Sequence, residues 1–225
     1  MPSKIFSHAV FELYQDGKGR KLFTKSILPG KAYFEETLSK ENGEEYREFD
    51  PNHSKLAATV VKGCPNTGIR KNDVVLYLGV SHGYTVSFVS DMVGKDGFIF
   101  GLDFAPRVMR DLVFIAEDRK NIAPLLGDAN HPETYADKVS QVDVVYQDIA
   151  QKNQADIFIR NCKMFLKKGG YGLLAIKARS IDIKKPSKVI FQEVRRLVEK
   201  EFTVIDYRFL DPFEKDHAFI IIKKS

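Results

Sequence analysis

Three features are scarce in this sequence: cysteine, long apolar runs, and any tail rich in glycine and arginine. The two cysteines, Cys64 and Cys162, lie far apart and match no metal-ligand spacing. This argues against a disulfide framework and a zinc site, and we predict no metal site. No run of 18 apolar residues occurs, so no membrane-spanning helix is predicted. The first ten residues lack the apolar stretch of a signal peptide, and we expect a cytoplasmic protein with reduced thiols.

The 225 residues suffice for one full-sized core and a small companion, because domains contain roughly 150 residues. Apolar residues make up 44% of the chain, which excludes a disordered protein. The net charge is +5, but it is unevenly distributed. Residues 1–54 carry a net charge of −1, whereas residues 167–196 hold nine basic and two acidic residues. Such a basic stretch is typical either of a solvated helix face or of a docking surface for a polyanion.

The first fifty residues predict short strands and turns. The expected strands cover residues 9–14, 20–24, 32–34 and 45–49. The first two flank Asp16-Gly-Lys-Gly19, which is a strong hairpin signal. Asp50-Pro51 then punctuates the chain. We therefore expect a small β-rich N-terminal domain over residues 1–53.

Residues 54–225 form the expected second domain, in which helices and strands alternate. The expected strands cover residues 74–78, 98–102, 122–126, 142–146 and 171–177. The expected helices begin after a Ser54 N-cap, around residues 86–92, at Pro106, and over residues 154–165 and 187–199. Two last strands, residues 202–209 and 218–223, are joined too closely for a helical crossover and should be antiparallel. This order predicts an α/β fold with the Rossmann-like sheet of class I methyltransferases.

A glycine loop, Gly79-Val-Ser-His-Gly83, lies between an expected strand and an expected helix. The glycines permit a tight turn and the close approach of a ligand, and the following helix N-terminus favours negative charge. A dinucleotide-binding fingerprint requires glycine where Ser81 stands, so a nicotinamide cofactor is not indicated. A simple packing turn is the alternative interpretation.

The same five residues also fit the Gly-x-Ser-x-Gly elbow of serine hydrolases. In that alternative Ser81 is the nucleophile, and Asp148 or Asp211 followed by His217 completes the order Ser, Asp, His. Against it, the loop follows the first strand of the sheet, so no earlier strand carries an oxyanion loop. The hydrolase reading also leaves several polar residues at other strand ends unexplained.

These polar residues stand at the ends of expected strands or near the start of the second domain. The set comprises Lys55, Asp103, Asp128, Asp148, Lys177 and His217. Asp103, 24 residues after Gly79, can accept hydrogen bonds from the hydroxyls of a ribose, and Asp128 from an adenine amine. Each residue alone also fits a cap, a surface charge or a structural role. Ligands bind outside the carboxyl ends of parallel strands, so these groups are candidates for one site.

Seven sequence blocks occur in an order that carries a family resemblance. They are Asp50-Pro-Asn-His-Ser-Lys-Leu-Ala-Ala58, Gly101-Leu-Asp-Phe-Ala-Pro-Arg-Val-Met-Arg110, Gly127-Asp-Ala129, Asp148-Ile-Ala-Gln151, Lys168-Gly-Gly-Tyr-Gly172, Ile176-Lys-Ala-Arg-Ser-Ile-Asp182 and Pro212-Phe-Glu-Lys-Asp-His217. From residue 50 onward the chain resembles the fibrillarin family, in particular the archaeal fibrillarin-like rRNA/tRNA 2′-O-methyltransferases. The β-rich start and the missing Gly-Arg tail also resemble the archaeal members. Three residues depart from the family pattern, namely His53 (usually Arg), Tyr84 (usually Thr) and Asp103 (usually Glu).

The resemblance implies an RNA ribose 2′-O-methyltransferase that uses S-adenosylmethionine. The implied catalytic residues are Lys55, Asp148, Lys177 and His217. The implied cofactor-binding residues are Gly79, Ser81, Gly83, Tyr84, Thr85, Asp103, Phe104, Asp128, Ala129, Asp148, Ile149, Ala150 and Gln151. We expect Asp148 to accept the hydroxyl proton and Lys177 to orient the hydroxyl, with Lys55 and His217 as supporting electrostatics.

The resemblance also implies that this chain is a subunit of a box C/D guide particle that acts on pre-rRNA and tRNA. The resemblance therefore implies a guide RNA, a target RNA, a Nop-domain scaffold protein and a kink-turn-binding ribosomal-type protein as partners. Candidate RNA contacts are Arg107, Arg110, Arg179, Lys184 and Lys185. Residues 55–225 carry a net charge of only +6, so we expect weak or no RNA methylation by the chain alone. A methyltransferase for proteins or small molecules and a catalytically silent particle subunit remain as alternatives.

Overall fold

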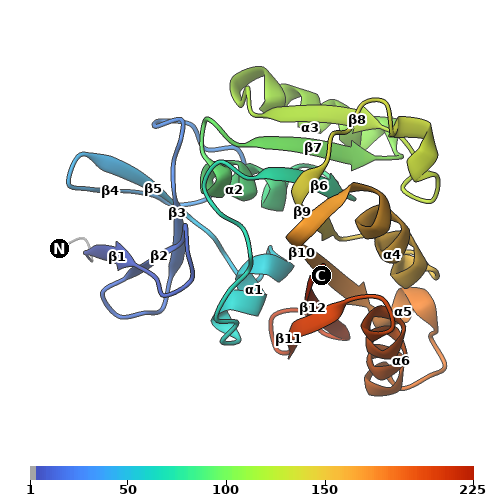
Figure 1. Ribbon diagram of the computed structural model, residues 1–225. Coiled ribbons are helices and arrows are strands. Elements are labelled where there is room, and N and C mark those ends of the chain that lie inside the picture. The colour runs from blue at the N-terminus through green and yellow to red at the C-terminus, as the bar shows by residue number, and fades with distance from the viewer. Residues whose placement is uncertain (1–3) are drawn as a thin grey trace.

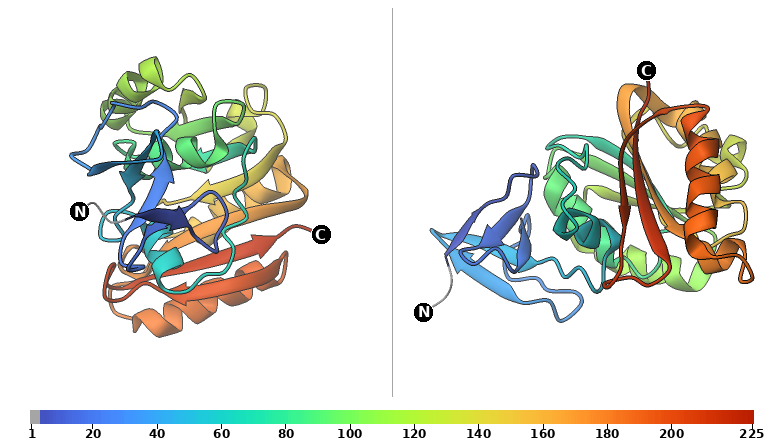
Figure 2. Two further views of the ribbon diagram at one scale, coloured as in Figure 1. Left: turned by 90° about the vertical axis from the view of Figure 1, so that its left-hand side faces the viewer. Right: turned by 90° about the horizontal axis from the view of Figure 1, so that it is seen from below.

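The structure is a computed structural model that describes residues 4–225. It contains a small sheet near the N-terminus and a large sheet with helices on both faces (Figure 1). Seen from below, the small sheet lies to one side of the large sheet, and the C-terminal helix α6 (Ser187–Glu199) lies on the other side (Figure 2).

The large sheet has seven strands. They are β6 (Val74–Leu78), β7 (Phe98–Asp103), β8 (Ile122–Leu126), β9 (Val142–Gln147), β10 (Leu166–Lys177), β11 (Thr203–Phe209) and β12 (His217–Lys223). Their spatial order is β11-β12-β10-β9-β6-β7-β8. Strands β6 to β10 pair in parallel, while β12 runs antiparallel to both β10 and β11. The predicted α/β sheet with a terminal antiparallel pair is thus confirmed.

The helices fall largely where the sequence predicts them. They are α1 (Lys55–Val61), α2 (Tyr84–Val93), α3 (Pro106–Asp118), α4 (Gln154–Phe165), α5 (Ala178–Ile181), α6 and the short 3₁₀ helix η1 (Pro132–Tyr135). The Ser54 side chain caps α1 by accepting the N–H of Ala57, and Pro106 occupies the first turn of α3, where no N–H is required. Helix α5 was not among the predicted helices. Within residues 4–225, none of these helices is long and apolar enough to cross a bilayer.

Both faces of the large sheet are covered, which explains why its strands are continuous apolar runs. Helices α1, α2 and α3 contribute to the core on one face, and α4 and α6 contribute to the core on the other. Because strand side chains alternate, Tyr77 and Tyr146 face the first core, whereas Leu76 and Val145 face the second. The sheet therefore presents its strand ends, rather than its faces, to a ligand.

The small sheet has five antiparallel strands in the order β1-β2-β3-β5-β4. They are β1 (Ile5–Ser7), β2 (Tyr14–Asp16), β3 (Leu22–Lys25), β4 (Leu38–Glu41) and β5 (Glu44–Glu48). The predicted β-rich character and the hairpin around residues 16–19 are confirmed, and β5 matches the strand expected at 45–49.

Two expectations for this region are wrong, and one strand, β4, was not expected. Residues 9–13 form turns, in which Val10 and Leu13 are buried without joining a strand. Residues 32–34 form a bend, and β4 lies partly in a segment that reads as polar. Asn42 and Gly43 both have positive φ angles, 51° and 80°, and make the two-residue turn of the β4–β5 hairpin.

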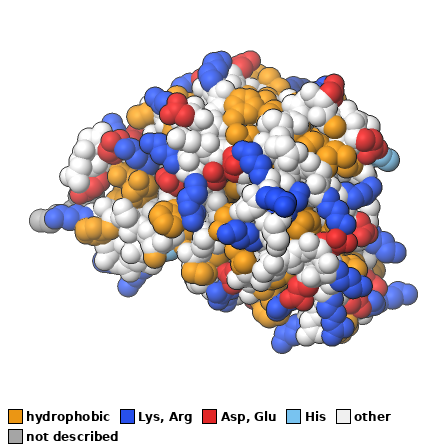
Figure 3. All heavy atoms as spheres, viewed as in Figure 1, with side chains coloured by type: hydrophobic (Ala, Val, Ile, Leu, Met, Phe, Trp, Pro, Cys, Tyr) orange, Lys and Arg blue, Asp and Glu red, His pale blue; other side chains and the backbone are white. Residues whose placement is uncertain are grey.

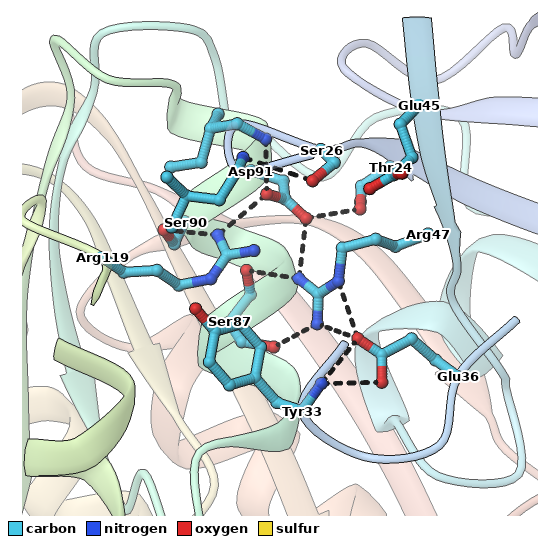
Figure 4. A network of polar contacts seen from close by, with 12 residues as sticks. Thr24, Ser26, Tyr33, Glu36, Glu45, Arg47, Ser87, Ser90, Asp91 and Arg119 are labelled. Atoms are coloured by element: carbon cyan, nitrogen blue, oxygen red, sulfur yellow. Dashed lines mark hydrogen bonds and ion pairs between the residues drawn. The ribbon is translucent and has the colours of Figure 1, made fainter. Parts of the chain in front are cut away.

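A buried polar network joins the small sheet to α2 (Figure 4). Asp91 on α2 pairs through one oxygen with Arg47 of β5 and through the other with Arg119, each at 2.8 Å. All three side chains are fully buried in these pairs. Phe49 also stacks on Phe88 of α2, with ring centroids 4.5 Å apart. The division of the chain into two domains at residue 53 stays a prediction, because these contacts make the two sheets share a core.

Candidate cofactor and catalytic site

A cavity of about 310 Å³ lies at the carboxyl ends of β6, β7, β8 and β9. Its lining consists of Gly79, Ser81, Leu102, Asp103, Phe104, Gly127, Asp128, Ala129, Asp148, Ile149, Ala150 and Gln151. Ten of these twelve residues are predicted cofactor contacts, and Leu102 and Gly127 are additional. The volume is in the usual range of small-ligand sites, roughly 300–1,000 Å³.

The glycine loop closes one side of this cavity. Gly79 has a φ angle of +81°, and a Cβ atom there would lie 2.5 Å from the backbone oxygen of Asp148. Only glycine therefore fits between the loop after β6 and the loop after β9. Ser81 also adopts a positive φ, 50°, and its N–H donates to a carboxylate oxygen of Asp103 at 3.0 Å.

Asp103 ends β7 and is 8% exposed. Its second oxygen accepts the N–H of Ala105 at 3.0 Å, so the carboxylate is fixed from two directions. Each carboxylate oxygen has two lone pairs, which leaves acceptor capacity for ligand hydroxyls. Phe104 lines the cavity with 67% of its surface exposed, and this large apolar surface suits a flat ring.

Asp128 follows β8 and belongs to a polar cluster centred on Asn130. The backbone N–H of Asn130, together with its side chain, donates to Asp128 and holds the pKa of that carboxyl below its usual range. The Asn130 side chain also donates to Gln151 at 2.9 Å and accepts from Asn153 at 2.7 Å. Asn130 thus joins the loops after β8 and β9, which line the cavity from two sides.

The predicted contacts Gly83, Tyr84 and Thr85 begin α2 and lie outside the cavity lining. Thr85 is buried, and its hydroxyl donates to the hydroxyl of Ser54 at 3.1 Å. Tyr84 packs against His53 with ring centroids 5.6 Å apart, so two of the departures from the family pattern touch each other. Burial raises the pKa of Tyr84 to about 12. The assignment of these three residues to the cofactor stays a prediction.

Lys55 and Asp148 form an ion pair of 2.9 Å beside the cavity. Lys55 is the first residue of α1, and Asp148 follows β9. Burial alone would lower the pKa of Lys55, but the charge and hydrogen bond of Asp148, with a smaller contribution from Glu214, raise it above its ordinary value. The ammonium group is therefore charged at neutral pH.

Lys177 and His217 face each other at the end of the β10–β12 ladder. His217 is 8% exposed, and its Nδ1 lies 2.7 Å from the backbone oxygen of Lys215. A carbonyl oxygen can only accept, so Nδ1 carries a proton. A carboxylate oxygen of Glu214 lies 3.7 Å from the same nitrogen, and the charge of Glu214 also contributes to the raised pKa of Lys55. The structure thus brings His217 and Lys55 to a common carboxylate, a link that the sequence analysis missed.

The predicted RNA contacts lie on the surface in two groups. Arg107 and Arg110 are exposed on α3, and the other three are exposed on or just after α5. Figure 3 shows Lys and Arg side chains, interspersed with acidic ones, over the lower right of the molecule, where Figure 1 places α6. Arg179 pairs with Asp216, and Lys185 pairs with Glu193, so part of this basic charge is compensated within the chain.

The hydrolase alternative lacks its central contact. In residues 4–225 no hydrogen bond joins Ser81 to His217, whose Nδ1 is engaged by a backbone oxygen. No cluster of His, Cys, Asp or Glu suited to a metal ion is found among the same residues. The sequence analysis also did not identify Asn130 and Gln154, whose side chains donate hydrogen bonds to Gln151 of the cavity lining. Only the position of Asn130, two residues after Asp128, offered a signal.

The sheet order and the cavity at its carboxyl edge define a Rossmann-like class I methyltransferase. The model of the fibrillarin family matches residues 3–225. The chain belongs to the fibrillarin family, as the sequence blocks predicted.

Two relatives show the extent of the match. A protein of Pyrococcus abyssi, named fibrillarin-like rRNA/tRNA 2′-O-methyltransferase, is 46% identical over 216 residues, which cover 96% of this chain and 95% of that protein. A protein of Methanocaldococcus jannaschii with the same name is 48% identical over 203 residues, covering 90% of this chain and 88% of that protein.

Three solved structures are similar over nearly the whole chain. The fibrillarin of Methanococcus jannaschii, a pre-rRNA processing protein, gives a TM-score of 0.94 at 44% identity and covers 100% of this chain and 98% of its own. The fibrillarin of Aeropyrum pernix, solved with natively bound S-adenosyl-L-methionine, gives 0.87 at 43% identity with coverage of 98% and 99%. A fibrillarin in complex with Nop5p gives 0.86 at 36% identity with coverage of 96% and 99%.

Proposed function

We propose that this protein is an RNA 2′-O-methyltransferase, the catalytic subunit of a box C/D guide ribonucleoprotein that acts on pre-rRNA and tRNA. The observation that carries the proposal is the Lys55–Asp148 ion pair of 2.9 Å, placed beside a cavity that fits a nucleoside. The names of the relatives support the reaction, and the cofactor-bound fibrillarin supports the cofactor.

The cavity residues fit an adenosyl cofactor by their chemistry. Asp103 offers acceptors for ribose hydroxyls, Asp128 offers acceptors for an amine, and Phe104 and Ile149 offer apolar surface for a purine. When bound, S-adenosylmethionine supplies an electrophilic methyl group on a sulfonium centre. The loop of residues 148–151 would face its methionine side, which places Asp148 next to the reacting position.

Each of the four proposed catalytic side chains has its own role. Asp148 accepts the proton of the ribose 2′-hydroxyl as the oxygen becomes a nucleophile, because a neutral hydroxyl attacks poorly. Lys177 orients that hydroxyl, and the ammonium group of Lys55 stabilises negative charge near it. His217 stands opposite Lys177 and adds a polar group at the same strand end.

The RNA substrate is held at this site by contacts to its phosphate backbone and by partner molecules. Arg107, Arg110, Arg179, Lys184 and Lys185 are exposed and can contact phosphates, which position a substrate without choosing its sequence. Sequence choice is assigned to a guide RNA. A Nop-domain protein, in line with the fibrillarin–Nop5p complex, and a kink-turn-binding protein would hold the assembly. We retain a cytoplasmic location as part of the proposal.

The decisive experiment is transfer of a labelled methyl group to target RNA, with and without the reconstituted particle. We expect efficient transfer to a ribose 2′-oxygen in the particle and little or none by the chain alone. Label on a base or on protein would contradict the ribose assignment. Efficient site-specific transfer by the isolated chain would contradict the need for partners. Calorimetry with S-adenosylmethionine separates a silent subunit, which would not bind, from an enzyme.

The role of Lys177 has its own test. Lys177→Ala is expected to abolish methyl transfer in the particle while leaving cofactor affinity largely intact. Lys168→Ala, an exposed lysine near the other end of β10, is the matched control and should keep the wild-type rate. Normal turnover in Lys177→Ala would remove that residue from the catalytic set.

A further inference from the structure

Gln154 is a fully buried residue whose side chain bonds to two separate segments of the site. Its Oε1 accepts the backbone N–H of Lys177 at 3.0 Å. Its Nε2 donates to the backbone oxygen of Gln151 at 2.8 Å and to that of Lys177 at 3.3 Å. One amide group therefore joins the end of β10 to the loop after β9, which lines the cavity.

The end of β10 lacks a neighbouring strand on this side. The parallel register between β9 and β10 ends at the pair Gln147–Leu174, three residues before Lys177. On the other side, Lys177 stands opposite His217, and the N–H of the next residue, Ala178, bonds to the oxygen of Asp216. In an antiparallel ladder, hydrogen-bonded and non-bonded pairs alternate.

It follows that Lys177 and His217 form a non-bonded pair, and that the backbone N–H and C=O of Lys177 both point away from β12. The Gln154 amide meets these two groups with one acceptor and one donor, as the backbone of a neighbouring strand would. Without this amide, two backbone groups at the last position of β10 would lose their protein partners.

The position of Gln154 is itself fixed by a second buried amide. Gln147 is fully buried and donates from Nε2 to the backbone oxygen of Gln154 at 2.6 Å. Gln147 directly precedes Asp148, so the chain of contacts begins next to the proposed proton acceptor. It runs through the first residue of α4 and ends at Lys177.

We propose that Gln154 is a positioning residue that sets the placement of Lys177 relative to the loop of residues 148–151. The inference rests on the proposed methyl transfer, in which that loop faces the cofactor and Lys177 faces the hydroxyl. Gln154 is absent from the cavity lining, so it acts through these backbone groups. We call the three hydrogen bonds of the Gln154 side chain to Gln151 and Lys177 the clamp. A misplacement of the reacting groups by about 1 Å can lower the rate roughly 100-fold, so we expect the clamp to be important for turnover.

The first test is Gln154→Met, which keeps the length of the side chain and removes its hydrogen bonds. We expect methyl transfer in the reconstituted particle to fall by about 100-fold. The dissociation constant for S-adenosylmethionine should rise by a smaller factor, because only the Gln151 oxygen is released from the cavity loop. Hydrogen exchange at the Lys177 amide should lose its protection, while the amides of residues 173–175 stay protected.

Asn121→Leu is the matched control, because Asn121 is another buried amide that bonds backbone oxygens, those of Ser90 and Gly94. It lies outside the cavity lining and should lower the melting temperature. Below that temperature we expect it to keep the wild-type transfer rate and the exchange protection of Lys177. An equal loss of rate in both variants would reduce Gln154 to a structural residue and overturn the proposal.

Gln154→Glu gives a second test with a pH signature. Burial raises the pKa of a carboxyl, and its protonated form regains one donor. A carboxyl oxygen can accept the Lys177 N–H in either protonation state, whereas the donor to the backbone oxygens of Gln151 and Lys177 returns only on protonation. The transfer rate, relative to wild type, should therefore recover as the pH falls. Gln154→Met should show no such recovery. The absence of recovery in Gln154→Glu, in a sample that melts cooperatively, would contradict the clamp.

These readouts also separate the clamp from the proposed function. If the wild-type particle fails to methylate a ribose, the proposed function fails. Amide exchange at Lys177 and the cofactor dissociation constant then still decide whether Gln154 holds the two segments together. If exchange protection is lost in Gln154→Met but the transfer rate is unchanged, the clamp exists and its role in positioning is wrong.

Discussion

The ammonium nitrogen of Lys55 lies 2.9 Å from a carboxylate oxygen of Asp148, a residue 93 positions further along the chain. The side chains are 18% and 25% exposed, so the pair is partly shielded from solvent, and Asp148 lines the cavity. A cation beside the proposed proton acceptor keeps that carboxylate oriented and stabilises negative charge that develops on a nearby oxygen.

Lys55→Met removes this cation while retaining the apolar part of the side chain. We expect the rate of methyl transfer in the reconstituted particle to fall by about 100-fold, the size of effect seen when one stabilising donor is lost. Lys62→Met, an exposed lysine just after the same helix, should leave the rate unchanged. A single-turnover assay with labelled cofactor measures both, and a wild-type rate in Lys55→Met would exclude an electrostatic role.

Gly79→Ala tests the closure of the glycine loop on the cavity. The added Cβ would lie 2.5 Å from the backbone oxygen of Asp148, and the φ angle of +81° disfavours alanine as well. We expect cofactor affinity, measured by calorimetry, to fall by more than about tenfold, equivalent to roughly 1.4 kcal/mol. Gly169→Ala is the control, because that glycine has φ +77° with open space around it. It should lose about 1–2 kcal/mol of stability and keep its cofactor affinity.

Arg47→Met breaks the buried network between the small sheet and α2. It removes the buried cation that pairs with the carboxylate of Glu36, and it leaves Asp91 paired with Arg119 alone. We expect the free energy of unfolding to fall by about 3–5 kcal/mol. Lys25→Met removes an exposed ion pair with Glu44 and should cost no more than about 1 kcal/mol. Urea denaturation measures the free energy of unfolding of both variants. Equal losses would show that the buried ion pairs of Arg47 contribute no more to stability than the exposed pair of Lys25.

Asp73→Asn should stabilise the protein in a pH-dependent way. Burial, with a further contribution from the charge of Asp143, raises the pKa of Asp73 from 3.8 to about 6, against opposing effects of Arg70 and Lys167. Because the folded-state pKa is raised, the charged carboxyl destabilises the fold fully above pH 6 and not at all below the unfolded value.

We therefore expect Asp73→Asn to gain about 1 kcal/mol at pH 8, after allowance for partial exposure, and to gain less as the pH falls toward 4. Asp137→Asn, at an exposed position, should change stability little. Denaturation curves at several pH values give the comparison. A gain that grows on acidification would reverse the sign and contradict the assignment.

The large sheet was predictable because its strands carry strong local signals. Residues 74–78 are an apolar run, residues 142–146 are apolar except for Asp143, and both segments are strands in the structure. The small sheet was less predictable, because β1 and β4 are only three and four residues long and mix polar with apolar side chains. Val10 and Leu13 look like strand residues, yet they are buried in turns, since burial does not require a strand.

Most of the cavity lining was predictable for a topological reason. The carboxyl ends of parallel strands meet at one edge of a sheet, so acidic residues that follow successive strands converge there. The side chains behind them were not predictable in this way. Gln154 reads as an ordinary helix residue, and Arg47 and Arg119 read as surface charges, because nothing local marks a polar side chain as buried.

The sequence by itself determined the element order, the family and the strand-end positions of the site, because these depend on hydrophobic pattern, turn residues and motif order along the chain. The tertiary structure decided which polar groups meet. Lys55 reaches Asp148, Gln154 reaches Lys177, and Arg47 and Arg119 share Asp91. Each of these contacts joins residues far apart in sequence, and only packing of the two sheets and their helices brings them within hydrogen-bonding distance.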